Sequence, residues 1–247
     1  MVEIKISTAN ELASLDKTIH PQPAKNFIPS WFKNMPVKVP LENADFKSDL
    51  MPHDRTIKAC PSMHDVFHSG VVFVSPCDVH LLVVKNEFTG EYDCTWHTPS
   101  KDYSMDIHKH VQMADHIKSS GIKAVFKYNY PFGMYAPEGY SAYQMPMLYH
   151  YEQLKDWHVP YGIVDIDRHH ELNPQVMFTS DKDEIIIKKG TPLCYYIAFK
   201  REDYQYNVVE YSEDLRKKTV LSRGNVFTHF KNGYLKTKKT GSNYKWR

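Results

Sequence analysis

The sequence predicts a single, mainly β domain followed by a short helix and a basic C-terminal arm. Aromatic residues are abundant, with 17 Tyr and 12 Phe, and β-strands favour aromatic side chains. Fifteen prolines divide the chain into short segments, and few stretches have the apolar spacing of a helix. Turn signals recur roughly every eight to twelve residues, which is typical of a sandwich, a jelly roll or a barrel.

The bulk composition is that of a folded domain. Of 247 residues, 42% are hydrophobic and 24% are charged, so a packed core is expected rather than disorder. No run of about 18 apolar residues occurs, and the first residues contain no apolar signal region, so we expect no membrane partner. Four cysteines form no CxxC pair, which favours free thiols in a reducing cytoplasm.

Residues 1–50 are predicted to form an extended N-terminal segment that packs on the domain. Residues 20–40 contain five prolines, and each proline fixes φ and removes a backbone donor. Within this segment Ser30 is predicted to cap one helical turn. We expect the aromatic side chains of Trp31 and Phe32, on that turn, to attach the segment to the domain.

Residues 51–211 are predicted to form the β domain, with one short helix near its start. Pro61 suits the first helical position and Gly70 suits the stop, so the helix should have one or two turns. Three further breaks separate the expected strands. They are Ser75-Pro76 between two strands, Thr89-Gly90 in a hairpin and Lys189-Gly190 between the last two strands.

Residues 212–247 are predicted to form a helix capped by Ser212 and a basic arm. From Leu215 to Arg247 there are ten Lys or Arg and no acidic residue, which leaves 21 basic and 29 acidic side chains elsewhere, a net charge of −8. The arm suits an acidic neighbouring subunit, a nucleic acid, or solvent. The contact residues expected are Arg216, Lys217, Lys218, Arg223, Lys236, Lys238, Lys239 and Trp246.

The stretch PYGIVDIDRHHELN, residues 160–173, holds the candidate catalytic residues. Asp165 and Asp167 are two apart, so a strand would place both carboxylates on one face, where they suit a general-base pair or a hard cation. The alternative is a strand that enters a turn, with residues 169–171 in solvent. We favour the turn, because clusters of charge are most often solvated loops.

Histidines supply the candidate metal ligands. His64 and His68 are four apart, and His108 and His110 are two apart, so each pair shares a face of a helix or a strand. His150 precedes Glu152 with the spacing of jelly-roll metal enzymes, if the segment is a strand. With 14 His in the chain, close pairs also arise by chance, and the sequence identifies no cofactor.

Five stretches in the same order and spacing resemble an uncharacterised family of tailed-phage proteins. They are AKNFIPSWFKNMP, IKACPSMHDVFHSG, PFGMYAPEGYS, GIVDIDRHHELN and IIIKKGTPLCYYIAFKRE. The resemblance covers most of residues 25–202 and brings no assigned chemistry. It implies a phage-encoded protein in the host bacterial cytoplasm or in the virion, with itself or other phage proteins as partners.

Residues 162–198 also resemble the segment of dUTPases and dCTP deaminases that joins a Gly-hydrophobic-hydrophobic-Asp motif, a strand, a Lys-Gly turn and another strand. The resemblance implies a jelly-roll or dUTPase-like β-clip sandwich, a trimer, and Asp165 as the catalytic carboxylate. Arg168-His169 replace the expected aromatic residue, and no Pro-Arg-Ser-Gly motif or Gly-rich arm is present. These departures argue against nucleotide hydrolysis.

No complete catalytic motif occurs in the sequence. GxSxG, GxGxxG and GxxxxGK[ST] are all absent. We therefore expect a non-catalytic phage protein that acts through assembly, either virion-associated or homo-oligomeric. The alternatives are a metal- or nucleotide-handling enzyme and a nucleic-acid-binding accessory protein that uses the basic arm.

Overall fold

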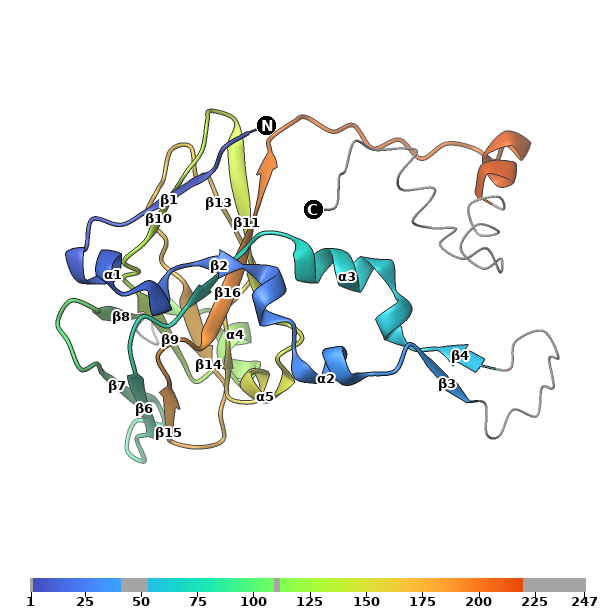
Figure 1. The fold of residues 1–247 in the computed structure, drawn as a ribbon. Helices are drawn as coiled ribbons and strands as arrows, with labels where there is room; N and C mark the ends of the chain where they lie inside the picture. The colour runs from blue at the N-terminus through green and yellow to red at the C-terminus, as the bar shows by residue number, and fades with distance from the viewer. Residues whose placement is uncertain (1, 41–52, 109–111, 220–247) are drawn as a thin grey trace. The chain divides into compact units, whose positions relative to one another are not determined.

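A computed structural model describes residues 2–40, 53–108 and 112–219 (Figure 1). The chain divides into two compact units, one of Met1–Met35 with Val66–Glu202 and one of Pro36–Asp65 with Asp203–Arg247. Each is described by itself. The domain boundaries predicted at residues 50 and 211 stay a prediction, and the proline-rich N-terminal segment contributes residues to both units.

The first unit is built around a five-stranded antiparallel sheet. Across the sheet the strands are β13 (Gly162–Val164), β11 (Tyr140–Pro146), β16 (Pro192–Lys200), β5 (Val71–Val74) and β2 (Gln22–Pro23). β11 and β16 lie side by side (Figure 1) and pair from Tyr140 with Lys200 to Pro146 with Cys194. β13 is therefore the outer strand at one edge, which leaves one of its sides without a neighbour in this sheet.

Three smaller antiparallel sheets complete the β structure of this unit. One contains β12 (Trp157–His158), β14 (Gln175–Phe178), β9 (Ala124–Tyr128) and β8 (Met105–His108). The second contains β15 (Glu184–Ile187), β6 (Val79–Lys85) and β7 (Tyr92–His97). The third pairs β1 (Lys5–Ser7) with β10 (Gly133–Tyr135). The prediction of a mainly β fold is confirmed at this level.

Helices in the first unit are short. They are α1 (Glu11–Leu15), η1 (Lys17–Ile19), η2 (Ala24–Phe27), α2 (Ser30–Asn34), α4 (Asp115–Ser119) and α5 (Tyr151–Leu154). The helix α3 (Pro61–His68) contains the boundary between the units and has two turns, as predicted from Pro61 and Gly70. No helix within the described ranges is long and apolar enough to cross a membrane.

The second unit contains one antiparallel pair, β3 (Lys38–Pro40) with β4 (His53–Arg55), and the turn η3 (Ile57–Ala59). Residues 213–219 are helical. Ser212 Oγ accepts from the backbone N–H of Leu215 at 3.4 Å, so the predicted helix cap is confirmed. The first backbone N–H groups of a helix have no carbonyl partner within the helix, so a side-chain oxygen at this position stabilises the helix start.

Large aromatic side chains fill the core of the first unit. Phe73, Phe126, Phe178, Tyr128 and Tyr196 are all less than 2% exposed. The ring of Phe73 meets that of Tyr196 edge-on at 5.0 Å, a geometry that aromatic quadrupoles favour. The abundant aromatic residues therefore form much of the buried core of this unit.

The proline-rich segment is attached by its aromatic residues, as predicted. Phe32 is 3% exposed, and Trp31 Nε1 donates to the Tyr149 carbonyl at 2.8 Å. The predicted cap at Ser30 is wrong: Pro29 occupies the N-cap position and no side chain caps the helix. A proline there fixes the entry of the chain without a side-chain acceptor.

The turn predictions are confirmed at each of the three positions. β5 ends at Val74 and β6 begins at Val79, on either side of Ser75-Pro76. Gly90, in the β6–β7 hairpin, has φ +73°, and Gly190, between β15 and β16, has φ +81°. Such positive φ values favour glycine because it has no Cβ.

Candidate functional site

The stretch that carries the two candidate carboxylates is a strand followed by a turn. β13 ends at Val164, and the carbonyl of Asp165 accepts from the N–H groups of Arg168 at 2.9 Å and His169 at 2.7 Å. The predicted turn is therefore present. Residue 170 departs from the expectation of a solvated loop, because the His170 ring stacks on Tyr135 with centroids 4.3 Å apart.

Both carboxylates bind one arginine that follows the last strand. Arg201 Nη1 lies 3.0 Å from Asp165 Oδ1 and 3.0 Å from Asp167 Oδ1, and its Nη2 donates to Asp167 Oδ2. Ser141 Oγ donates to Asp165 at 2.6 Å, and the N–H of Gly139 donates to Asp167 at 2.7 Å. The Asp167 side chain is 2% exposed, whereas that of Asp165 is 48% exposed.

These partners hold both carboxylates in the ionised form. The hydrogen bond from Arg201 lowers the pKa of Asp167 to about 2, and the hydroxyl of Ser141 is the main cause that lowers the pKa of Asp165. A carboxylate that already accepts charged and neutral donors is a weak general base at neutral pH. The geometry therefore suits a clamp that joins the β13 turn to β11 and β16.

Arg201 was not among the predicted site residues. It stands 34 residues after Asp167 in the sequence, so no local spacing connects the two. The available signal was chemical: arginine is the side chain that binds a carboxylate through two parallel hydrogen bonds. It also follows directly on β16, the strand that pairs with β11.

The predicted histidine ligands do not form a metal centre within the described residues. His64 and His68 both lie on α3, and His64 Nε2 is 2.6 Å from the carbonyl of Lys58. His108 lies on β8, and His110 lies outside the described residues. Among the residues that the structure describes, no three His, Cys, Asp or Glu side chains are grouped to hold a metal ion.

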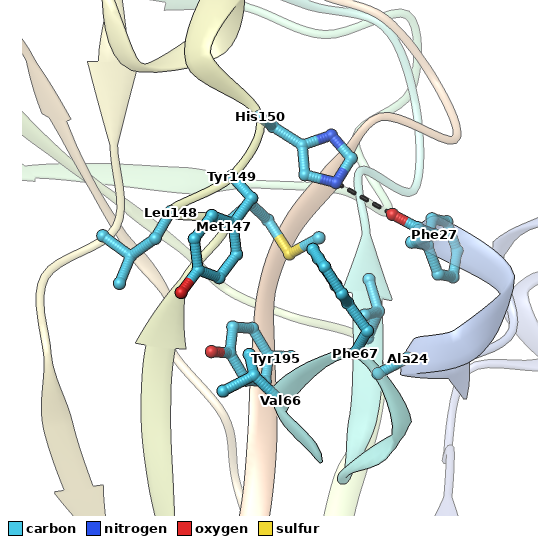
Figure 2. Close-up of a pocket in the computed structure, with 10 residues that line it drawn as sticks. Ala24, Phe27, Val66, Phe67, Met147, Leu148, Tyr149, His150 and Tyr195 are labelled. Carbon is cyan, nitrogen blue, oxygen red and sulfur yellow. Dashed lines mark hydrogen bonds between the residues drawn. The ribbon is translucent and has the colours of Figure 1, made fainter. Parts of the chain in front are cut away.

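His150 is a packing residue in this structure. It precedes the helix α5, so the strand needed for the His150–Glu152 metal spacing is not formed. Its Nε2 lies 3.0 Å from the Phe27 carbonyl, at the edge of an apolar pocket that Phe67, Met147 and other residues line (Figure 2). Burial lowers the pKa of His150, and the pocket has a volume of only about 20 Å³. That volume admits about one water molecule.

The outer face of the five-stranded sheet exposes apolar and aromatic side chains. Tyr143 on β11 is directly opposite Ile163 on β13 and Ile197 on β16, so the three form a row across the strands. The ring of Phe199 stacks on Tyr143 with centroids 4.2 Å apart and an interplanar angle of 20°. Tyr143 is 44% exposed and Ile163 is 62% exposed. We call these four residues the aromatic surface.

The opposite face of the same strands is buried. Ala142 is 0% exposed and Tyr196 is 1% exposed. The sheet therefore has one face in the core. The other face presents the aromatic surface, although Tyr195 and Ser141 on that face are buried. Single exposed apolar residues are ordinary, whereas contiguous apolar groups at the surface are less common.

Only the beginning of the basic arm is described. Arg216, Lys217 and Lys218 lie in the helical segment 213–219 and are exposed. Arg216 Nε pairs with Glu213 at 3.1 Å, one helical turn away. The other predicted contact residues, Arg223, Lys236, Lys238, Lys239 and Trp246, lie outside the described residues.

Comparison with known proteins yields little that bears on chemistry. No protein-family description matches the chain, and no curated protein matches its sequence. Among solved structures the fold is similar to native EIAV dUTPase, with a TM-score of 0.32 and 9% sequence identity. The overlap covers 57% of this chain and 83% of that one. A similarity this distant identifies no site, and the phage resemblance stays a prediction.

Proposed function

We propose that this chain is a non-catalytic β protein that acts by assembling with copies of itself. The observation that carries the proposal is the aromatic surface on the outer face of the β13–β11–β16 sheet. Aromatic residues are enriched in the buried centres of protein interfaces, where they contribute much of the binding energy. It also includes Ile163 of the edge strand β13, which has no further neighbour in this sheet.

The charge distribution supports a second copy as the occupant. The ten basic residues of 215–247 and the net charge of −8 on the remainder are carried by the same chain. Each copy therefore brings both members of a complementary pair, and charge complementarity accelerates and orients association. In this proposal the aromatic surface contributes most of the binding free energy. The basic arm orients the approaching copy and then binds the acidic part of that copy.

The clamp formed by Arg201 supports a non-catalytic reading over the enzyme alternative. An acid/base pair needs at least one carboxylate free to exchange a proton with a substrate. Here Asp165 and Asp167 share one guanidinium, and their pKa values are lowered. A nucleotide-handling site would also need phosphate ligands, for which the sequence offers no known motif.

The phage origin and the detailed β topology belong to this proposal. The five stretches that resemble tailed-phage proteins support a phage-encoded chain in the host bacterial cytoplasm or in the virion. The motif of residues 162–198 supports a β-clip arrangement, and in related β-clip proteins such an arrangement forms a trimer. We propose a homo-oligomer of this kind, with phage proteins as further candidate partners.

Native mass spectrometry of the full chain and of a chain that lacks residues 215–247 tests the proposal. We expect a metal-free homo-oligomer for the full chain and a smaller or weaker assembly for the truncated one. A second variant, R216Q/K217Q/K218Q, keeps helix propensity and removes three charges. It should reduce association at low salt, since screening weakens the same contacts.

Two outcomes would reject this function. A full chain that stays monomeric at high protein concentration would exclude self-assembly. Stoichiometric Fe, Zn or Mn in the purified protein would favour the enzyme alternative instead. Fluorescence anisotropy with a labelled single-stranded oligonucleotide tests the nucleic-acid-binding alternative. Binding that falls steeply with salt concentration would favour that alternative.

A further inference from the structure

A polar hollow of about 340 Å³ opens on the first unit, and its lining shares no residue with the aromatic surface. Three segments that are distant in the sequence form it: the end of β1, residues 129–135 and residues 170–173. Pockets that bind small molecules are typically about 300–1,000 Å³. The hollow is therefore large enough for a ligand, unlike the apolar pocket of Figure 2.

One wall of the hollow is a fixed aromatic platform. Tyr135 is 41% exposed, and its ring lies nearly parallel to the imidazole of His170 at 4.3 Å and 28°. His170 Nδ1 lies 3.0 Å from the Ile166 carbonyl and 3.2 Å from the Met134 carbonyl. Because both partners are acceptors, Nδ1 carries a proton and donates to these two carbonyls. The imidazole thus holds the tyrosine ring in place.

The backbone beside the platform is closely packed. The N–H of Met134 donates to the His170 carbonyl at 3.0 Å, and Gly133 forms a bridge with Glu171. A Cβ at Gly133 would lie 2.7 Å from that same carbonyl oxygen. Only glycine allows this approach, so the main chain of residue 171 is held close to β10, the strand that carries Tyr135.

The polar groups around the platform select a neutral ligand. The lining contains Ser7, Asn129, Glu171 and Asn173 but no Lys or Arg. Asn129 Nδ2 donates to Ser104 Oγ at 2.9 Å, which orients the amide and leaves its oxygen as an acceptor. A phosphate or carboxylate would meet the Glu171 carboxylate without a compensating cation, which is unfavourable. Hydroxyl groups, by contrast, can donate to these acceptors.

We infer that this hollow binds a neutral saccharide. The C–H face of a sugar ring packs flat on Tyr135, where dispersion contacts accumulate. Its hydroxyl groups donate to the Glu171 carboxylate and to the side-chain oxygens of Asn129 and Asn173. The site is independent of the assembly function and adds a ligand class that the assembly surface does not supply.

Saturation-transfer NMR on the full chain tests this inference, with glucose, galactose, mannose and N-acetylglucosamine as probes and uridine monophosphate as the anionic comparison. We expect transfer from at least one sugar and none from the nucleotide. Y135L should weaken that signal about tenfold while keeping apolar bulk, and E171Q should weaken it by a similar factor. Y151L, at a tyrosine that is 52% exposed on α5, is the matched control and should bind as the unaltered chain does.

Three results would contradict the binding of a saccharide. The inference is overturned if no sugar shows transfer, if uridine monophosphate binds in place of the sugars, or if Y135L and E171Q bind as well as Y151L does. Circular dichroism of each variant establishes folding. If Y135L fails to fold, E171Q alone decides, because Glu171 is exposed and its replacement by Gln preserves size.

Discussion

Replacing the two most exposed side chains in the row across the sheet, I163T with Y143T, is expected to dissociate the homo-oligomer. Threonine keeps the strand preference of both positions. A buried Tyr removes about 200 Å² from water, so the 44% of Tyr143 that is exposed corresponds to about 90 Å², or about 2 kcal/mol of binding at roughly 25 cal/mol per Å². The 62% of Ile163 that is exposed adds about 1–2 kcal/mol.

Together these losses amount to about 3 kcal/mol per copy, which weakens the dissociation constant by at least about 100-fold. Sedimentation velocity over a range of protein concentrations measures the change. The matched control is I186T on β15, where the isoleucine is 51% exposed but belongs to a different sheet. The reasoning is refuted if the double variant and the control have the same dissociation constant, or if the control dissociates first.

Three further predictions concern the stability of the fold. G70A should destabilise it by roughly 2–5 kcal/mol in urea unfolding, because Gly70 has φ +74° and a Cβ there would lie 2.2 Å from the Tyr196 carbonyl oxygen; a loss below about 1 kcal/mol would contradict this. Y196F removes the hydroxyl that donates to Gln144 Oε1 at 2.6 Å and should cost about 1–3 kcal/mol, since it leaves a buried acceptor unpaired; an unchanged denaturation midpoint would contradict it. The pKa of Asp167 is lowered from 3.8 to about 2 by Arg201, so this carboxylate stabilises the fold above its ordinary pKa and the contribution is lost as pH falls through about 2. R201Q should therefore move acid unfolding, followed by circular dichroism, to higher pH, and D167N should flatten the pH dependence of stability between about pH 4 and pH 2. Unchanged profiles would show that the contact between Arg201 and Asp167 does not stabilise the fold.

The turns were predictable because their chemistry is local. A positive φ at Gly90 or Gly190 depends on the absence of a Cβ at that one residue, and the break at Ser75-Pro76 depends on the missing N–H of proline. The attachment of Trp31 and Phe32 followed from their size and from their place on a single helical turn within a proline-rich segment. The cap at Ser30 was mispredicted by one position, since Pro29 and Ser30 are adjacent and both suit a helix start.

The candidate site was predictable only in part. The sequence placed Asp165 and Asp167 at the end of a strand and in a turn, and the structure agrees. It also suggested that His150 lay on a strand, whereas a short helix follows it, because a His-x-acid spacing is compatible with either. Residues 109–111 and 220–247 carry predictions that lie outside the described residues.

By itself, the sequence determined the mainly β class, the positions of the turns, the two-turn helix from Pro61 and the opposed charges of body and arm. The tertiary structure decided which side chains meet. Arg201 reaches Asp167 because β11 pairs with β13 on one side and with β16 on the other. The saccharide hollow likewise needs three separate segments, and the aromatic surface needs the register that aligns Tyr143 with Ile163 and Ile197. Strand pairing joins residues without regard to their separation along the chain, so no local pattern in the sequence encodes these contacts.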